Sequence, residues 1–349
     1  MPHGNMIGLQ RRSVIDLCML GHIYDCLTLC CSLLSSIMFG LFGGKSFEPA
    51  KDIPDLSGKV IIVTGGNTGL GKESVLQLAK HNPSQIYLAA RTESKATSAI
   101  EEIKSQVPNA KVEFLSLDLT DFDSVKSAAE TFKQKEQRLD ILLNNAGVMA
   151  MPYSKTKQGY EIQFGTNHMG HALFTKLLLP TLLKTAEEPN ADVRIVTLSS
   201  EGHNLAPRSC GVIYDQAAAE TFGPWGRYGS AKLANILYSR GLTAHYPSLT
   251  CVAVHPGVIK TELYNSTERD NALIRYGLAA VGNIFMASVP QGTKNQLWAA
   301  TAAKDEVRKA YFFTTPVGSA SQGSGFAKDQ KGVDKLWEWT EEELKKHGY

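Results

Sequence analysis

From Lys59 onward, short apolar segments alternate with segments of helical spacing. The first apolar segment, 60–65, is rich in β-branched residues, and the segment 72–80 after it has a helical pattern. Continuous apolar strands are typical of parallel sheets that helices cover on both faces. The alternation therefore predicts an α/β fold, a doubly wound parallel sheet in a single domain. The other predicted strands are 85–90, 112–119, 141–144, 193–199, 250–255 and 311–314, and the other predicted helices are 95–106, 123–135, 161–183, 228–245 and 288–301.

The composition fits a globular protein and argues against nucleic acid as a partner. Of the 349 residues, 43% are apolar and 20% charged, and the formal net charge is only +2, without a basic patch. The six cysteines show neither zinc-finger spacing nor a disulfide framework. The main body therefore suits a reducing compartment.

The N-terminal extension, residues 1–56, contains an uncharged apolar segment at 26–42. This segment is at the short edge of the roughly 20 residues that span a bilayer. Arg11 and Arg12 precede it, as they would in a membrane anchor. A packed or disordered extension and a start at Met38 are the alternatives, and the sequence leaves all three open. We expect the body on the cytoplasmic face, either soluble or anchored to an intracellular membrane, with membrane contact only through 26–42.

The turn between the first strand and the first helix is rich in glycine and includes Gly65, Gly69 and Gly71. Without a Cβ, glycine lets the backbone turn tightly and approach a pyrophosphate, while the following helix N-terminus offers free N–H groups. The turn therefore predicts a dinucleotide site. The predicted cofactor contacts in this turn are Gly65, Asn67, Thr68, Gly69, Leu70, Gly71 and Lys72.

The end of the second strand predicts which dinucleotide binds. Enzymes that use NAD usually place an acid there, but positions 88–92 contain none and include Arg91. A guanidinium suits a 2′-phosphate, so we expect NADP(H). The alternative is a solvated arginine at a helix start. Asp118, at the end of the third strand, is a candidate contact of the adenine amino group or a helix cap, and the small residues after the fourth strand should pass close to the ribose: Asn145, Ala146 and Gly147.

A tyrosine and a lysine, Tyr228 and Lys232, are four residues apart and share one face of a predicted helix. Carbonyl reduction needs a proton on oxygen, and a tyrosine with a pKa of about 10 supplies it more readily beside an ammonium, which favours the phenolate. Ser200 ends a strand at the carboxyl edge of the sheet, where it can hold a substrate oxygen or cap the strand. No metal site is predicted from the histidines His168, His171, His203 and His255.

Over about residues 57–315, the order of these motifs resembles the short-chain dehydrogenase/reductase family. Three stretches are similar to its retinol-dehydrogenase-like branch, which includes reductases of fungal secondary metabolism: NTGLG at 67–71, NHMGH at 167–171 and LSSEGH at 198–203. The resemblance implies a Rossmann fold and hydride transfer between a nicotinamide cofactor and a carbonyl or alcohol.

The resemblance also implies roles for individual residues. Tyr228 matches the general acid/base, and Lys232 matches the residue that lowers the tyrosine pKa and binds ribose. Ser200 matches the serine that orients the substrate, and Asn167 the helix asparagine that holds a water in the proton relay. The residues that match the segment around the nicotinamide carboxamide are Val258 and Thr261.

The remaining segments bear on the substrate. Ser200 and Tyr228 are farther apart than in the family's shortest members, so we interpret 203–227 as a substrate lid. The apolar residues of 262–290 suggest a substrate cover and a lipophilic substrate, in keeping with secondary-metabolite biosynthesis, and 316–349 is predicted as a C-terminal tail. Imine or double-bond reduction and a non-catalytic, cofactor-binding regulator remain alternatives. The sequence does not distinguish a homodimer from a monomer.

Overall fold

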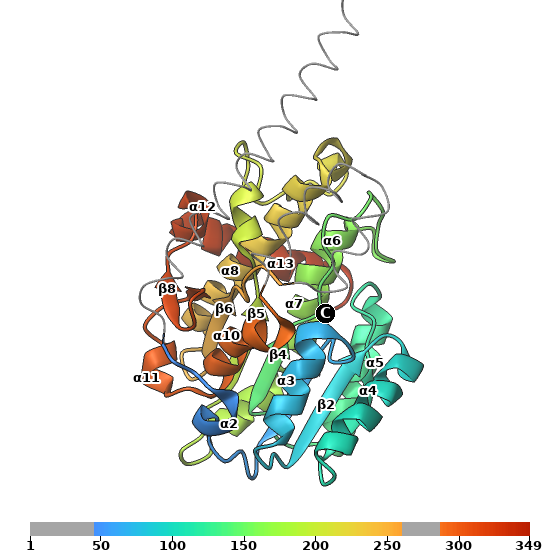
Figure 1. Cartoon of the computed structure of the whole chain (residues 1–349). Helices are drawn as coiled ribbons and strands as arrows, with labels where there is room; N and C mark the ends of the chain where they lie inside the picture. Colours follow the sequence, from blue (N-terminus) through green and yellow to red (C-terminus); the bar gives the residue numbers. More distant parts are fainter. Residues whose placement is uncertain (1–44, 260–286) are drawn as a thin grey trace, which may run out of the picture. The chain divides into compact units, whose positions relative to one another are not determined.

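The computed structural model describes residues 45–259 and 287–349 (Figure 1). The candidate anchor 26–42, Thr261 and residues 262–286 of the substrate cover lie outside the described residues. The strands are β1 (Val60–Thr64), β2 (Gln85–Ala90), β3 (Val112–Ser116), β4 (Ile141–Asn144), β5 (Arg194–Leu198), β6 (Thr250–Val254), β7 (Phe312–Thr314) and β8 (Ser319–Ser321). The α-helices are α2 (Pro49–Asp52), α3 (Gly69–Ala79), α4 (Glu93–Gln106), α5 (Phe122–Lys135), α6 (Ile162–Phe164), α7 (Gly170–Ala186), α8 (Pro224–His245), α10 (Val289–Thr301), α11 (Lys304–Val307), α12 (Gly325–Lys328) and α13 (Gln330–Lys346). The π-helix is η1 (Gly165–Met169), and the 3-10 helices are η2 (Glu201–Leu205) and η3 (Ala218–Thr221).

The described strands form one sheet in the order β3-β2-β1-β4-β5-β6-β7-β8. All neighbours are parallel except β7 and β8, which are antiparallel. The chain runs outward from β1 to β3 and then returns to β4 on the other side of β1. This reversal creates the switch point at which doubly wound sheets bind ligands. The predicted doubly wound parallel sheet is confirmed, with β8 as an antiparallel addition.

Alternate residues of each strand enter different cores, because successive side chains point to opposite faces of a sheet. In β1, Ile61 and Val63 pack on one face with α3, α4 and α10, whereas Val60 and Ile62 pack on the other with α5, α7, α8 and α13. Figure 1 shows these helices on both sides of the sheet. The two cores hold the strand ends, and therefore the site residues on them, in fixed positions.

Residues 316–349, predicted as a C-terminal tail, fold into the same compact unit as the sheet. Strand β8 extends the sheet, and α13 packs against α8. The stripe of α13 that faces inward has helical spacing and is buried: Val333, Leu336, Thr340 and Leu344. Trp337 stacks on Tyr238 and on His245, with ring centroids 5.5 and 4.1 Å away. The tail is therefore part of the core around α8.

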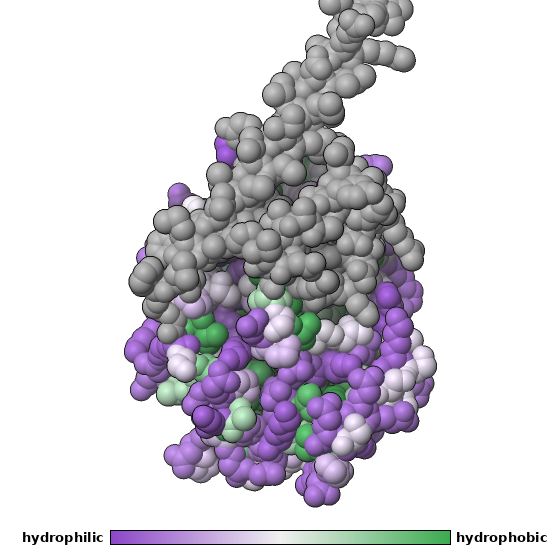
Figure 2. All heavy atoms as spheres, viewed as in Figure 1, coloured by the Kyte–Doolittle hydropathy of each residue, from purple (hydrophilic) through white to green (hydrophobic). Residues whose placement is uncertain are grey.

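The described surface is mainly polar. On the face drawn in Figure 2, hydrophilic residues cover most of the described area and hydrophobic ones form small separate patches. Among the helices of residues 45–259 and 287–349, none combines the length and the apolar character needed to cross a bilayer.

Candidate active site

The glycine turn lies between β1 and α3 as predicted from the sequence. Gly65 has a φ of +65°, in the left-handed region that favours glycine, and its N–H donates to the Ala89 carbonyl (2.8 Å). A Cβ on Gly71 would overlap the carbonyl oxygen of Gly65, so only glycine allows α3 to begin this close to the turn. The first turn of α3 carries no acidic residue that would repel a phosphate.

The loop after β4 is bonded directly to this turn. The Thr64 Oγ1 atom accepts the N–H groups of Asn145 and Ala146, both at 3.0 Å, and the Asn145 Nδ2 atom donates to the Thr64 carbonyl (2.8 Å). A Cβ on Gly65 would lie 3.0 Å from the Ala146 Cα. The structure therefore brings the two predicted halves of the cofactor site, the glycine turn and residues 145–147, into contact.

The other residues predicted to contact the cofactor near β1 and β2 differ in their exposure and in their bonding partners. Arg91 is exposed just after β2, and within the described part of the chain its side chain has no hydrogen bond or ion pair. Lys72 is paired with Glu102 (2.6 Å), which directs its ammonium toward α4. Asn67, Thr68 and Leu70 are half-buried on the turn.

Asp118 lies two residues beyond β3 and does not cap the next helix. Its Oδ1 atom accepts the backbone N–H and the hydroxyl of Thr120 (2.9 and 2.7 Å), whereas Asp121 is the N-cap of α5. Asp118 therefore stabilises the turn that follows β3, and the helix-cap alternative is wrong.

The segment around Val258 also lies beside the glycine turn. The carbonyl of Val258 accepts the N–H of Ala287 (2.9 Å), just before α10. A Cβ on Gly292 of α10 would collide with Ile259 and lie 3.3 Å from Leu70, so these two side chains meet at this glycine. Ile259, the residue after Val258, therefore lies beside Leu70 of the turn, and the cofactor contact of Val258 itself stays a prediction.

Tyr228 and Lys232 lie on α8, and both are buried with 5% of their surface exposed. The Lys232 ammonium is 5.8 Å from the centroid of the Tyr228 ring and donates to the Leu198 carbonyl at the end of β5 (2.9 Å). Burial lowers the pKa of Lys232 to about 8. A cation that is desolvated and held by a single carbonyl acts more strongly on a nearby phenol than a solvated one would.

Ser200 is brought next to Tyr228 by the 3-10 helix η2. Its Oγ atom accepts the N–H of Gly202 (3.0 Å) at the start of that helix. A Cβ on Gly202 would lie 2.6 Å from the Tyr228 Cε1 atom and 3.2 Å from the Ser200 Oγ atom. The tyrosine ring and the serine hydroxyl therefore meet at a glycine. The neighbouring Ser199 is buried and donates instead to the Lys232 carbonyl (2.7 Å), so it joins β5 to α8.

Asn167 lies in the π-helix η1 and is fully buried. Its side chain bonds to both backbone groups of Val148: Oδ1 accepts the N–H (2.8 Å) and Nδ2 donates to the carbonyl (2.9 Å). A Cβ on Gly147 would lie 3.0 Å from the Asn167 Oδ1 atom and 3.5 Å from the Lys232 Nζ atom. Asn167 and Lys232 thus meet at the loop after β4, and π-helical turns often occur at functional sites.

His171 joins the two halves of the site, a role that the sequence did not predict. Its Nδ1 atom lies 3.1 Å from the Asn167 carbonyl oxygen, which can only accept, so Nδ1 carries the hydrogen and donates. In a neutral ring Nε2 is then an acceptor, and it lies 2.9 Å from the Thr64 hydroxyl. Burial lowers the pKa of His171 to about 4, in keeping with a neutral ring. The signals in the sequence were its position one helical turn after Asn167 and its place in the stretch NHMGH at 167–171.

The model of the short chain dehydrogenase family matches residues 59–272. The chain belongs to the short-chain dehydrogenase family. Over 310 residues it is 39% identical to a short-chain dehydrogenase/reductase of Aspergillus calidoustus, covering 84% of this chain and 96% of that protein. It is 36% identical over 284 residues to retinol dehydrogenase 12 of Mus musculus, covering 81% and 85% of the two chains. The solved structure of an uncharacterised protein from Mycobacterium Paratuberculosis superposes with a TM-score of 0.62 at 28% identity, covering 87% and 98%.

As a short-chain dehydrogenase, the protein is an oxidoreductase of a family that binds nicotinamide cofactors. The relatives confirm the predicted retinol-dehydrogenase-like branch. The described residues fit such a cofactor, because the missing Cβ atoms of Gly65 and Gly71 leave the backbone of the turn open to close approach. The site residues gather at the carboxyl ends of β1, β4 and β5, where ligands bind to doubly wound sheets.

Proposed function

We propose that this protein transfers hydride between NADP(H) and a carbonyl or alcohol of a lipophilic small molecule. The observation that carries the proposal is the meeting of Tyr228 and Ser200 at Gly202, with the buried Lys232 ammonium 5.8 Å from the tyrosine ring. Such a group can hold a substrate oxygen and exchange a proton with it. A role in secondary-metabolite biosynthesis is part of the proposal.

In the reductive direction, Ser200 orients the substrate oxygen and Tyr228 donates a proton to it. The bound cofactor would supply the hydride to the carbonyl carbon. Lys232 stabilises the phenolate that remains, while its bond to the Leu198 carbonyl keeps the ammonium in place. Asn167 fixes the backbone at Val148, beside Gly147, and we assign it to the relay that returns a proton to Tyr228. In the oxidative direction, each step runs in reverse.

The residues assigned to the cofactor follow the ends of five strands, β1, β2, β3, β4 and β6. The turn 65–72 would hold the pyrophosphate, residues 145–147 the ribose, and Val258 with Thr261 the nicotinamide carboxamide. Asp118 keeps its Oδ2 atom unbonded within the described residues, so it can accept from the adenine amino group. Arg91 is exposed, has no partner among residues 45–259 and 287–349, and follows a strand end without an acid, which favours a 2′-phosphate and therefore NADP(H).

The proposed lid, 203–227, supports a lipophilic substrate. Trp225 packs edge-on against Tyr228, with ring centroids 6.2 Å apart. An indole at this point puts apolar surface beside the proton donor. One relative is, by its name, a dehydrogenase of retinol, which is a lipophilic alcohol. Reduction of an imine or a carbon–carbon double bond on the same scaffold is the second candidate, because the residues that bind the cofactor would be the same.

The test is a substrate screen that follows NADPH consumption with the full chain and with the variants Tyr228→Phe and Tyr87→Phe. Tyr87 is a buried tyrosine that donates to Glu136 away from the site and serves as the control. Tyr228→Phe should lower kcat about 10²- to 10⁴-fold, the usual contribution of a general acid, and leave NADPH binding within a few-fold. Equal turnover in Tyr228→Phe would refute the acid–base assignment. Binding of NADPH without turnover of any substrate class would favour the alternative of a non-catalytic, cofactor-binding regulator. Analysis of the products separates carbonyl reduction from imine or double-bond reduction.

A further inference from the structure

A buried ion pair, Glu161 with Arg227, lies outside the residues assigned above. The Arg227 Nε atom donates to the Glu161 Oε1 atom at 3.1 Å, and only 5% and 1% of the two side chains are exposed. Removing two charges from water is costly, and the attraction between them offsets this only when further hydrogen bonds satisfy both groups. The other hydrogen bonds of Glu161 and Arg227 therefore show which parts of the chain this ion pair holds together.

Arg227 joins three segments around the proposed substrate site. Besides Glu161, its guanidinium donates from Nη1 to the Phe222 carbonyl in the proposed lid and from Nη2 to the Met151 carbonyl in the loop after β4 (2.9 Å). A guanidinium makes these bonds in fixed, divergent directions, which a lysine cannot reproduce. Since Arg227 directly precedes Tyr228, these bonds fix the helical turn that carries the proposed proton donor.

Glu161 holds the segment that carries Asn167. Its Oε2 atom accepts the N–H groups of Gln163 and Phe164 (3.0 and 2.9 Å), which makes Glu161 the N-cap of α6. Helix α6 continues without a break into η1 and Asn167. The Gln163 side chain donates to the Pro224 carbonyl (2.9 Å), a second bond between α6 and the start of α8. One carboxylate thus bonds both to the arginine of α8 and to the first N–H groups of the Asn167 segment.

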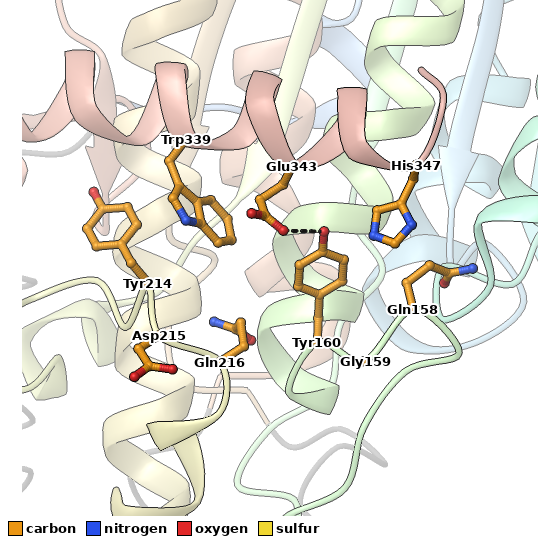
Figure 3. A pocket seen from close by; sticks show the side chains of 9 residues that line it. All are labelled: Gln158, Gly159, Tyr160, Tyr214, Asp215, Gln216, Trp339, Glu343 and His347. Atoms are coloured by element: carbon orange, nitrogen blue, oxygen red, sulfur yellow. Dashed lines mark hydrogen bonds between the residues drawn. The ribbon is translucent and has the colours of Figure 1, made fainter.

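The backbone of Glu161 is bonded to the proposed lid, and its neighbour Tyr160 is bonded to α13. The Glu161 backbone N–H donates to the Gln216 side chain (2.9 Å). Gln216 and Tyr160 line a pocket with a volume of about 270 Å³. Figure 3 shows this pocket beside α13, where the Tyr160 hydroxyl donates to Glu343 (2.9 Å). The backbone of Glu161 is therefore fixed from outside while its carboxylate points to Arg227.

We propose that Glu161 and Arg227 form a clamp that positions Tyr228 and Asn167 relative to each other. The inference rests on the proposed function, since it assigns these two residues to proton transfer. The loop after β4 is held at two points, by Asn167 at Val148 and by Arg227 at Met151. The Glu161–Arg227 ion pair connects the segment that carries Asn167 with the helix that carries Arg227, so the two anchors are also joined to each other. Glu161 and Arg227 are positioning residues, and they act through Asn167 and Tyr228.

The test compares Glu161→Gln, Arg227→Met and the double variant with Arg194→Met in the full chain. Arg194 is a matched control because its side chain is equally buried (5% exposed) and also ion-paired, but it lies at the amino end of β5, far from the strand ends of the site. Each clamp variant should lower kcat by about tenfold or more, a change of about 1.4 kcal/mol in the barrier. NADPH affinity should stay within a few-fold, and the double variant should lose no more than either single variant, because the pair acts as a unit.

Two outcomes would overturn the clamp. In the first, kcat falls in proportion to the melting temperature, and to the same extent in the clamp variants and in Arg194→Met. In the second, the losses of kcat add in the double variant. If the unaltered protein turns over no substrate, the proposed function fails, and the clamp is then judged by hydrogen exchange. Faster exchange at 162–169 and 224–232 in Glu161→Gln than in Arg194→Met supports the clamp, and equal exchange there overturns it.

Discussion

Arg91 shows how much can depend on one exposed side chain. It follows β2 directly and has no partner among the described residues, so its guanidinium is available to a ligand at this strand end. The sequence placed it correctly, because the end of a strand followed by a helix is readable from apolar and polar patterning. Asn167 is the opposite case, since a polar residue within a helix is usually just solvated. Only the family resemblance singled it out, and its bonds to Val148 depend on contacts that are distant in sequence.

Changing Arg91 to aspartate should exchange the cofactor preference. The variant loses a charge-assisted contact with the 2′-phosphate, worth about 1.5–3 kcal/mol or about 10- to 100-fold in NADPH affinity. An acid at this point can instead accept a hydrogen bond from the 2′-hydroxyl of NADH. The measurement is a fluorescence titration with both cofactors. The control Lys111→Asp makes the same change of charge just before β3, at the amino end of that strand, and should leave both affinities unaltered. An unchanged preference in Arg91→Asp would contradict the assignment to NADP(H).

At the scale of elements, the strands were predicted best. Six of the predicted strand segments are short, apolar and bounded by turn residues. These properties can be recognised from neighbouring residues in the sequence alone. The third strand was predicted to run to 119 but ends at Ser116, because Asp118 bonds to Thr120 and turns the chain. The helix that carries Tyr228 begins at Pro224 rather than at Tyr228 itself, and a proline suits this first position since its missing N–H has no helical partner. Helix α13 was missed, although its apolar residues have helical spacing in the sequence. That spacing does not say what the helix packs against, and its partner α8 is distant in the sequence.

Helix α13 should contribute substantially to stability through Leu336, which is fully buried against the core around α8. Leu336→Ala is expected to lower the free energy of unfolding by about 2–5 kcal/mol, the range for removing a buried leucine side chain. Urea denaturation measures this change. Glu338, two residues on and exposed, provides the control Glu338→Ala, which should alter stability by about 0.5 kcal/mol or less. Equal, small effects would mean that α13 does not belong to the cooperative core.

At the scale of the whole molecule, buried histidines couple the fold to pH. Burial lowers the pKa of His168 and His255 to about 3 and of His171 and His203 to about 4, from the ordinary 6.5. The rings stay neutral in the folded protein because the interior disfavours their charged form. Between pH 4 and 6.5 the unfolded chain therefore binds more protons than the folded one. Stability from this source is complete above pH 6.5 and declines as the pH falls below it.

The free energy of unfolding should accordingly fall as the pH is lowered from 6.5 to 4. In His168→Gln the slope near pH 5 should be shallower by about one proton, or about 1.4 kcal/mol per pH unit, because one buried ring is gone. Urea unfolding at several pH values measures the slopes, and equal slopes in the variant and the unaltered protein would rule out His168 as a source of the acid sensitivity.

Gly202 has a consequence for how the sequence can vary. It carries no functional group, yet even the methyl group of an alanine would press on the Tyr228 ring and crowd the Ser200 hydroxyl. Substitution there changes the spacing of Tyr228 and Ser200, to which we assign the proton transfer, while leaving both of them in the sequence. Genomic surveys that recognise active relatives by their serine, tyrosine and lysine alone would count such a chain as intact. The identity of the second residue after the serine is therefore a useful additional criterion for sorting working enzymes from inactive copies.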